Sequence, residues 1–459
     1  MSENKGWVGK EFNRKEDHRL TTGRGKYLAD IVIPGTLHIV FTRSDRAHAL
    51  IKSIDTSKAE AMPGVVAVYT GDGIKDKILS MPQPVVTPAL PAHHPEHWPL
   101  AVNKVHFHGE PVAAVVARDK YVAEDAAELI EVDYEDLPYV GNPVDALKPD
   151  APIVHEGWDD NLLFEMTFTG GDTAESQAEN DAEVEKIFQS ADVVVREKFT
   201  AHRSGVAPME TRGALIDWDE SDGLLAYLTT QRPHIDRLAL SDILEIPAEK
   251  VRVIAPRDQG GGFGVKAPFY REPILIAYIA RQLGRPIRWI ETRQEHLMAV
   301  SQERGQTQEI EIAADKNGKL LALRNRGLAD CGDGCEGVYW GYLMPFLGSV
   351  EIPNAYHWPI GDVKLKVAVT NKSALSPARA FGELPPRFAM ERAIDMVAKA
   401  CNMEAADVRR NNLVSELPHM SITNEYFDSG DFIKVWDNLM DYAKLADFRK
   451  EQAAARAEG

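Results

Sequence analysis

Residues 258–266 read DQGGGFGVK, a stretch in which four of the nine residues are glycine. The Val- and Ile-rich residues 251–256 before it predict a strand, and residues 271–284 after it have the apolar spacing of an amphipathic helix that ends at Gly284. A glycine has no Cβ, so its backbone N–H can approach a ligand closely. The cluster can therefore form an anion-binding nest between a strand and a helix, or a tight turn that packing alone requires.

A dinucleotide-binding fingerprint is the other candidate for this cluster. Gly262, Gly264 and Ala267 have the spacing of that fingerprint. The fingerprint, however, requires a strand that runs straight into its first glycine. Here residues 257–261 intervene, and Pro268 falls in the first turn of the helix. We therefore disfavour the dinucleotide interpretation.

The composition is that of a globular protein with two or three domains. The 459 residues are 44% hydrophobic and 27% charged, and 52 Lys+Arg against 70 Asp+Glu leave a formal charge of −18. Such an excess of carboxylates gives no general attraction for nucleic acid or for an anionic membrane. No apolar run approaches the roughly 18 residues of a membrane span, so we expect none.

The three cysteines provide neither a disulfide framework nor the ligand set of a zinc or iron–sulfur site. They are Cys331, Cys335 and Cys401. The first thirty residues are polar and lack the apolar core of a secretory signal. We therefore expect a cytoplasmic protein whose electron carriers, if it handles electrons, lie on other chains.

Short apolar runs and amphipathic stretches predict an α+β protein with large mixed sheets. Residues 111–117, PVAAVVA, have the composition of a strand buried on both faces, and residues 120–132 have that of an amphipathic helix. The other expected strands lie at residues 37–42, 65–70, 193–202, 213–219, 224–230, 287–292, 308–313 and 319–329. The other expected helices lie at residues 233–243, 391–401 and within 431–459.

The chain divides into five expected regions. A polar N-terminal arm (1–19) precedes a first α/β domain (20–145). A charged linker with several prolines (146–164) leads to a second domain (165–415), and a C-terminal helical tail (416–459) follows.

Seven short motifs occur in a fixed order along the chain and together resemble one known family. Residues 23–30 read GRGKYLAD, and the other motifs lie at residues 43–49, 109–113, 207–210, 230–231, 260–264 and 378–382. Through this series, from about Trp7 to Leu445, the chain resembles the molybdenum-binding subunit of the xanthine dehydrogenase/aldehyde oxidase family, the molybdenum hydroxylases. Each motif alone is weak, whereas the ordered series is specific.

The resemblance implies an α/β hammerhead-like domain followed by the first molybdopterin-binding domain, with mixed sheets. It also implies a molybdenum-dependent oxidoreductase that hydroxylates an electron-poor carbon with water. The metal would be held through the dithiolene of a molybdopterin-type cofactor in a dinucleotide form, with no direct protein ligand. Electrons would pass to [2Fe–2S] clusters and FAD on partner subunits.

Five positions match family residues that line the molybdenum centre. Gln231 matches a glutamine that hydrogen-bonds an oxygen on the metal. The backbone N–H groups of Phe263 and Gly264 would donate to the cofactor, and Gly261 and Gly262 would leave room for its approach.

Two further positions match the substrate pocket of the family. Arg379 would engage a substrate carbonyl or the cofactor, and Phe381 would stack on a flat substrate. Considered without the resemblance, Arg379 is a solvated surface side chain and Phe381 is a core aromatic. Gln231 in that case caps the helix that begins near Pro233.

Other polar residues have simpler interpretations. Glu210, in the sequence PMET, could be a general acid or base, but we expect it to have a structural hydrogen-bonding role. The histidines His48, His202 and His234 show no metal-ligand spacing, and we expect them to be satisfied or surface side chains.

The catalytic glutamate of the family has no counterpart in this sequence. It belongs to a Gly-Val-Gly-Glu motif in a second molybdopterin-binding half, which some members carry on a separate polypeptide. We therefore expect this chain to be the N-terminal half of a split subunit, with a partner subunit that supplies the glutamate. The competing expectation is a non-catalytic scaffold or cofactor-chaperone paralogue of the same fold.

Departures from the family pattern narrow the expected substrate. Purine-oxidising members carry a glutamate and an arginine where this chain has Ala267 and Thr307. Carbon monoxide-oxidising members carry a cysteine where this chain has Ala380. An aldehyde, an N-heteroaromatic ring or a related small organic substrate remains.

Overall fold

Strand β5 (Pro111–Ala117) is buried along its whole length, as its Val- and Ala-rich sequence predicts. It lies in a seven-stranded mixed sheet with the order β11-β10-β9-β12-β1-β5-β3. The other six strands are β1 (Leu37–Arg43), β3 (Val65–Thr70), β9 (Gly213–Asp219), β10 (Gly223–Leu228), β11 (Val251–Ile254) and β12 (Ile287–Ile290). The structure is a computed structural model, and it describes residues 6–7, 10–81, 95–334 and 338–459.

Several helices of the described chain pack on the seven-stranded sheet. Helix α4 (Lys120–Ala127) contacts β1 and β5, α8 (Arg271–Leu283) contacts β9 and β12, and α7 (Pro233–Ile243) contacts β11. Helix α8 forms the centre of this core, because nine of its 13 residues are buried. It ends at Gly284, whose left-handed conformation (φ 57°) is the helix end that the sequence predicts.

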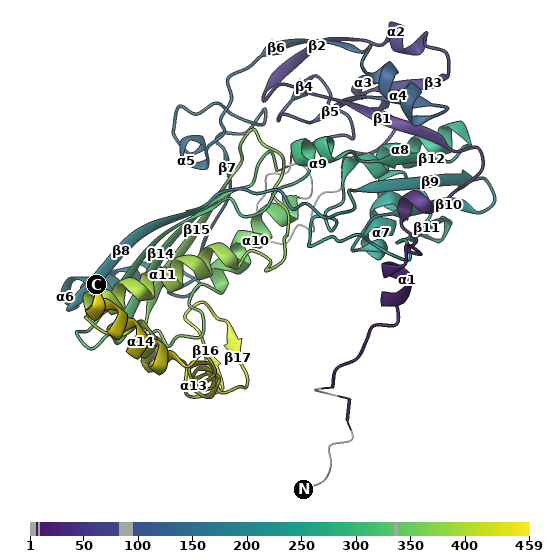
Figure 1. Ribbon diagram of the computed structural model, residues 1–459. Helices are drawn as coiled ribbons and strands as arrows, with labels where there is room; N and C mark the ends of the chain where they lie inside the picture. Colours follow the sequence, from purple (N-terminus) through teal and green to yellow (C-terminus); the bar gives the residue numbers. More distant parts are fainter. Residues whose placement is uncertain (1–5, 8–9, 82–94, 335–337) are drawn as a thin grey trace.

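The seven-stranded sheet joins segments that are far apart in the sequence. Strand β1 pairs in parallel with β12, and Leu37 lies opposite Ile287. Strands β1, β3 and β5 precede residues 146–164, whereas β9 to β12 follow them. The sheet therefore continues across the segment that the sequence suggests as a linker (Figure 1).

A smaller antiparallel sheet with the order β4-β2-β6 adjoins this lobe. Its strands are β2 (Ala49–Asp55), β4 (Lys104–Val105) and β6 (Glu131–Asp136). The short helices α2 (Ser57–Glu60) and α3 (Gly71–Ile74) contact β3, and α5 (Pro143–Ala146) contacts the five-stranded sheet of the second lobe. The helix expected over 120–132 is therefore too long. Residues 131–136 pair with β2 instead, because Val132 and Tyr134 alternate inward on one face of a strand.

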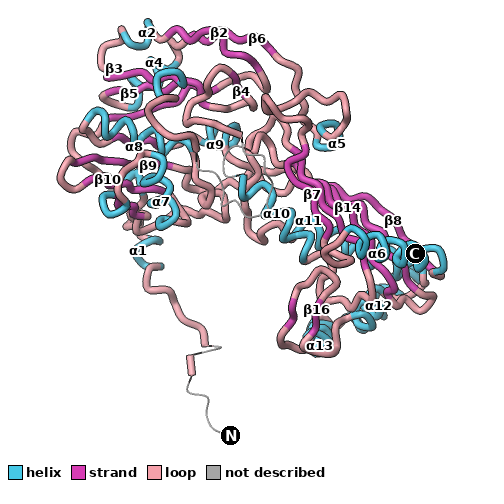
Figure 2. The backbone as a smooth tube through the Cα atoms, turned by 180° about the vertical axis from the view of Figure 1, so that it is seen from behind, coloured by secondary structure: helices cyan, strands magenta, loops and turns pink. Residues whose placement is uncertain are grey.

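The second lobe is a long five-stranded sheet with the order β7-β15-β14-β13-β8 (Figures 1 and 2). Its strands are β7 (Leu162–Thr167), β8 (Val193–Ala201), β13 (Gln306–Ala314), β14 (Leu320–Asp330) and β15 (Gly361–Ala368). Successive residues of β13 face opposite sides of this sheet. Ile312 lies in the core formed with α11 (Leu384–Ala400), and Ala313 lies in the core formed with α6 (Ala174–Ser190).

The remaining helices connect or extend these lobes. They are α1 (Asp17–Thr21), α9 (Arg293–Ala299), α10 (Val338–Val350), α12 (Ala405–Asn412), α13 (Phe432–Tyr442) and α14 (Leu445–Glu458). Short 3-10 turns lie at Leu28–Asp30 and Ala248–Lys250. Strands β16 (His419–Met420) and β17 (Tyr426–Phe427) form a two-stranded hairpin. Helix α13 and strand β16 of the hairpin lie below the five-stranded sheet in the view of Figure 2.

Two helix boundaries differ from the expectation. The helix expected over 391–401 begins earlier, at Leu384, because Pro385 and Pro386 occupy its first turn, where proline is tolerated. The charged tail is helical as expected, but Lys444 in a left-handed conformation (φ 51°) separates α13 from α14.

Candidate functional site

The glycine cluster forms a loop between β11 and α8, and part of its backbone carries unused hydrogen-bond donors. Among the described residues, the N–H groups of Gly261, Gly262 and Phe263 meet no acceptor. Gly261 and Phe263 have positive φ values of 96° and 54°. Consecutive backbone donors of this kind can hold an anion or an oxo oxygen.

Close packing explains why the loop is rich in glycine. A Cβ on Gly262 would lie 2.6 Å from Oε1 of Gln231, and one on Gly264 would lie 2.3 Å from the carbonyl oxygen of Pro377. A larger residue at Gly264 would have to move the backbone at Pro377, whereas one at Gly262 would displace the side chain of Gln231. Packing therefore accounts for these glycines but leaves the unused donors unexplained.

Gln231 lies between β10 and α7, and the glycine loop fixes its side-chain amide. Its Oε1 accepts the N–H of Gly264 at 2.9 Å, and its own backbone N–H donates to the carbonyl of Lys266 at 3.0 Å. Because the oxygen is engaged, the amide presents its NH2 group as the remaining donor on this exposed side. The Gly264 N–H, expected to donate to a cofactor, is engaged within the protein.

The alternative role of Gln231 as a helix cap is wrong. The N-cap of α7 is Arg232, and none of the described side chains caps this helix. Pro233 occupies the first turn, where the missing N–H needs no partner.

The loop at Arg379 lies directly against the glycine loop. The backbone N–H of Arg379 donates to the carbonyl of Phe263 at 2.7 Å. Ala380, Phe381 and Gly382 follow with φ values of 74°, 32° and 95°. A left-handed conformation costs free energy in residues other than glycine, so the surrounding packing must hold this segment in place.

The side chains of both loops face outward. Arg379 is exposed, and its guanidinium makes no ion pair or hydrogen bond with any residue in the described part of the chain. The ring of Phe381 is 39% exposed and that of Phe263 is 51% exposed. Phe381 is therefore not the core aromatic that its sequence alone allows.

Glu210 anchors the start of the glycine loop. Its Oε2 accepts the N–H of Gly260 at 2.9 Å and also binds the ammonium of Lys266 at 2.9 Å. Burial lowers the pKa of Lys266, although the nearby Glu210 carboxylate opposes that shift. The structural hydrogen-bonding role expected for Glu210 is confirmed.

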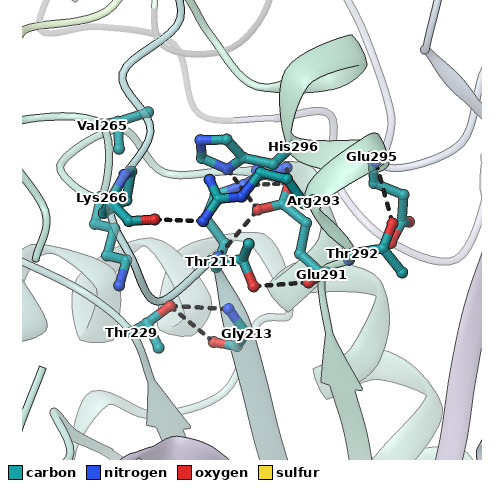
Figure 3. Close-up of polar contacts among 12 residues, drawn as sticks. Thr211, Gly213, Thr229, Val265, Lys266, Glu291, Thr292, Arg293, Glu295 and His296 are labelled. Carbon is teal, nitrogen blue, oxygen red and sulfur yellow. Dashed lines mark hydrogen bonds and ion pairs between the residues drawn. The ribbon is translucent and has the colours of Figure 1, made fainter. Parts of the chain in front are cut away.

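A cluster of buried charges was missed from the sequence, and Figure 3 shows its members Glu291, Glu295 and His296 near Lys266 of the glycine loop. Its members form ion pairs across β1, β9, β12, α8 and α9, and they are Arg43, Arg212, Glu272, Glu291, Glu295 and His296. Burial opposes the ionisation of Glu291, but the Arg212 guanidinium outweighs it and lowers the pKa to about 2. The sequence contained one indication of this buried cluster, because the charged pair Arg271-Glu272 begins a helix whose following residues are mostly apolar.

A small cavity of about 30 Å³ is lined by Thr230, Asp236, Lys266 and Trp289 among others. Most of its lining is apolar, and Asp236 is one of its few polar groups. Burial raises the pKa of Asp236 to about 6, while a hydrogen bond from Thr230 opposes that shift.

Two of the three singled-out histidines are surface side chains as expected, whereas His48 is buried with only one ring nitrogen hydrogen-bonded within the described residues. His48 is buried, with Nδ1 2.7 Å from the carbonyl of Pro138, and His202 and His234 are exposed. In the described ranges, no group of three or more His, Cys, Asp or Glu side chains could hold a metal ion. Cys331 is buried, and Cys335 lies outside the described residues.

No helix among those the structure describes combines the length and apolar character that a membrane crossing needs.

Two family models match the sequence. Residues 159–413 match a molybdopterin cofactor-binding domain. Residues 22–138 match the α/β hammerhead domain of aldehyde oxidase and xanthine dehydrogenase.

Individual relatives agree with these models. The chain is 37% identical over 465 residues to the carbon monoxide dehydrogenase large chain of Afipia carboxidovorans, which covers 97% of this chain and 55% of that relative. The crystal structure of quinoline 2-oxidoreductase from Pseudomonas putida 86 matches with a TM-score of 0.88 at 32% identity, over 98% of this chain and 56% of that one. The nicotinate dehydrogenase large molybdopterin subunit of Eubacterium barkeri is 26% identical, with 88% of each chain covered. The chain thus spans about half the length of the first two and most of the length of the third.

Proposed function

The chain belongs to the xanthine dehydrogenase/aldehyde oxidase family of molybdenum hydroxylases, and on that premise we propose that it is the molybdenum-cofactor-binding subunit of a multi-subunit oxidoreductase. The family models support a division near the expected domains, a hammerhead-like domain over 20–145 and a first molybdopterin-binding domain over 165–415.

One observation carries this proposal. The unused donors are the N–H groups of Gly261, Gly262 and Phe263, the NH2 group of Gln231 and the exposed guanidinium of Arg379. They lie on three segments, and hydrogen bonds tie both Gln231 and the Arg379 loop to the glycine loop. A molybdopterin-type cofactor is anionic and carries oxygen ligands on the metal, so a cluster of donors without acceptors fits it.

Each residue would have a distinct task at this site. Backbone N–H groups and the Gln231 amide would hold cofactor oxygens without adding charge. Arg379 would offset negative charge or orient a substrate carbonyl through bidentate hydrogen bonds. Phe381, with its ring partly exposed, would stack on a planar substrate. The cofactor, when bound, supplies the two-electron oxidation.

The substrate we propose is an aldehyde, an N-heteroaromatic compound or a related small organic molecule. Ala267 is buried against Met344 and Leu375, and Thr307 bonds Thr200 across the sheet at 3.1 Å. Neither position offers the charged anchor of purine-oxidising members. Ala380 has no thiol for copper, which disfavours carbon monoxide even though a carbon monoxide dehydrogenase is a relative.

We further propose that a partner subunit completes the site with the catalytic glutamate, and that [2Fe–2S] and FAD subunits receive the electrons. Apolar side chains around the two loops are exposed as if for a covering chain, with Met209 at 93%, Phe388 at 57% and Leu384 at 42%. The relative of matching length from Eubacterium barkeri, named as a subunit, supports a separate polypeptide of this size.

Purification of the tagged chain from its native cells tests the proposal. The expected result is copurification with a second chain that carries the Gly-Val-Gly-Glu motif, with molybdenum and pterin in the complex and oxidation of aldehydes or N-heterocycles with an artificial acceptor. A stable, monomeric and metal-free chain would support the scaffold or cofactor-chaperone alternative instead.

A further inference from the structure

The glycine loop has few side chains of its own, so residues outside it must hold its shape. Glu210 is one of them. Its Oε2 accepts the N–H of Gly260 at 2.9 Å, and its backbone N–H donates to the carbonyl of Gly260 at 3.1 Å. Glu210 therefore fixes the loop immediately before the unused donors of Gly261, Gly262 and Phe263.

Lys266, at the other end of the loop, binds the same carboxylate. Its Nζ lies 2.9 Å from Oε2 of Glu210, and its side chain is fully buried whereas that of Glu210 is 17% exposed. A buried ammonium is tolerated only where a carboxylate neutralises it, because its desolvation is costly. One carboxylate oxygen thus joins both ends of the loop.

Charge explains why two residues are used here. Glu210 alone would place an uncompensated carboxylate next to donors suited to an anionic group, and like charges at short range repel strongly where water is excluded. Lys266 cancels this charge from the buried side. The loop keeps the hydrogen bond to Gly260 without the repulsion.

We propose that Glu210 and Lys266 are positioning residues, which anchor the glycine loop and keep the surroundings of its unused donors electrically neutral, so that the loop can hold an anionic group. This inference rests on the proposed function, because the anionic group is the molybdenum cofactor.

Three variants distinguish the hydrogen bond that Glu210 accepts from Gly260 from the charge balance between Glu210 and Lys266. Lys266→Met leaves the Glu210 carboxylate unpaired. Glu210→Gln with Lys266→Met is neutral and keeps a side-chain acceptor for Gly260. Glu210→Ala with Lys266→Met is also neutral but has no acceptor.

The measurement is molybdenum per folded chain in the purified complex, together with released pterin and the visible circular dichroism of the bound cofactor. Lys266→Met should lower the molybdenum content at least about tenfold, since an unpaired buried charge is costly. The double variant Glu210→Gln/Lys266→Met should have a molybdenum content within about threefold of wild type. The double variant Glu210→Ala/Lys266→Met should have a molybdenum content as low as that of Lys266→Met. Lys198→Met is the matched control, because Lys198 forms a comparable pair with Glu309 at 2.9 Å on an exposed sheet face.

Two results would overturn the inference. One is a wild-type molybdenum content and dichroism spectrum in Lys266→Met, and the other is a folded Gln/Met double variant that remains depleted. The double variant decides the matter if Lys266→Met fails to fold. A wild-type complex without molybdenum would instead contradict the proposed function. The proposed function is therefore tested by the wild type alone, and the inference by the variants.

Discussion

Nδ1 of His296 lies 2.8 Å from Oε2 of Glu291, and Nε2 of the same imidazole lies 2.6 Å from the carbonyl oxygen of Val206. Both neighbours are acceptors, because Arg212 keeps Glu291 ionised and a carbonyl cannot donate. His296 therefore ties α9 to both Glu291 and the backbone at Val206. It lies in a buried cluster in which Arg43 and Arg212 pair with Glu272, Glu291 and Glu295.

His296→Gln should destabilise the protein by about 1–3 kcal/mol, because it removes one of two buried hydrogen bonds and leaves an acceptor without its partner. Urea unfolding followed by fluorescence measures the change. His234→Gln is the control, since His234 is exposed on α7. Equal stability of the two variants would contradict this bridging role of His296.

Gln231→Ala should lower turnover by about 100-fold, the usual effect of removing a donor that acts on developing charge, while the subunits still copurify. Gln231→Glu tests the donor separately, because it keeps an acceptor for Gly264 and loses the NH2 group. Steady-state rates normalised to molybdenum content give the comparison. An unchanged rate in both variants would remove Gln231 from the site.

Phe381→Ala should raise KM for a planar substrate by about three- to tenfold, with a smaller effect on kcat, because stacking contributes to binding. Phe448→Ala, in the helical tail with a ring 52% exposed, is the matched control. A KM equal to that of wild type would assign Phe381 to loop packing alone.

Gly264→Ala should separate the two loops of the site. Gly264 has a φ of 108°, and an added Cβ would lie 2.3 Å from the carbonyl oxygen of Pro377. Gly157→Ala is the control, since Gly157 also has positive φ (84°) but no atom within 4 Å of an added Cβ. Loss of molybdenum in the first variant and retention in the second is expected. Retention in both would show that the contact is dispensable.

Asp236→Asn should stabilise the protein at pH 7.5 and have little effect at pH 4. Burial raises the pKa of Asp236 to about 6, so its contribution to stability is present below about pH 4 and is lost as the pH rises through 6. A pKa near 6 instead of near 4 corresponds to roughly 3 kcal/mol above pH 6. Unfolding midpoints of Asp236→Asn and of the exposed Asp242→Asn, measured across pH 4–8, check this. A larger gain at pH 4 would contradict the assignment.

Local sequence patterns were enough to predict those helices and strands whose burial follows one simple rule along their length. The Val-rich β5 and the helix α8 with its end at Gly284 were predictable, because each pattern is set by burial along one element. The glycine loop was also recognisable, since close approach excludes side chains. Helix α11 was only partly recognised, because prolines in a first helical turn resemble a loop.

Contacts between distant segments were not predictable from local patterns. The Phe263–Arg379 hydrogen bond and the pairing of Arg43 with Glu272 join residues more than one hundred positions apart. Nothing in the residues near either partner identifies the other. The resemblance to a family supplied the first pair of loops, whereas it said nothing of the buried charges.

The pairing of β1 with β12 also constrains how the chain folds during synthesis. Leu37 cannot pair with Ile287 until the ribosome has made the 250 residues that separate them, so the seven-stranded sheet stays incomplete until then. At roughly 5–20 residues per second, a ribosome needs about 12 to 50 s to make that stretch. Once the Val-rich β5 has been made, its layer stays open until β12 follows, so the nascent polypeptide leaves apolar strands exposed for much of this interval.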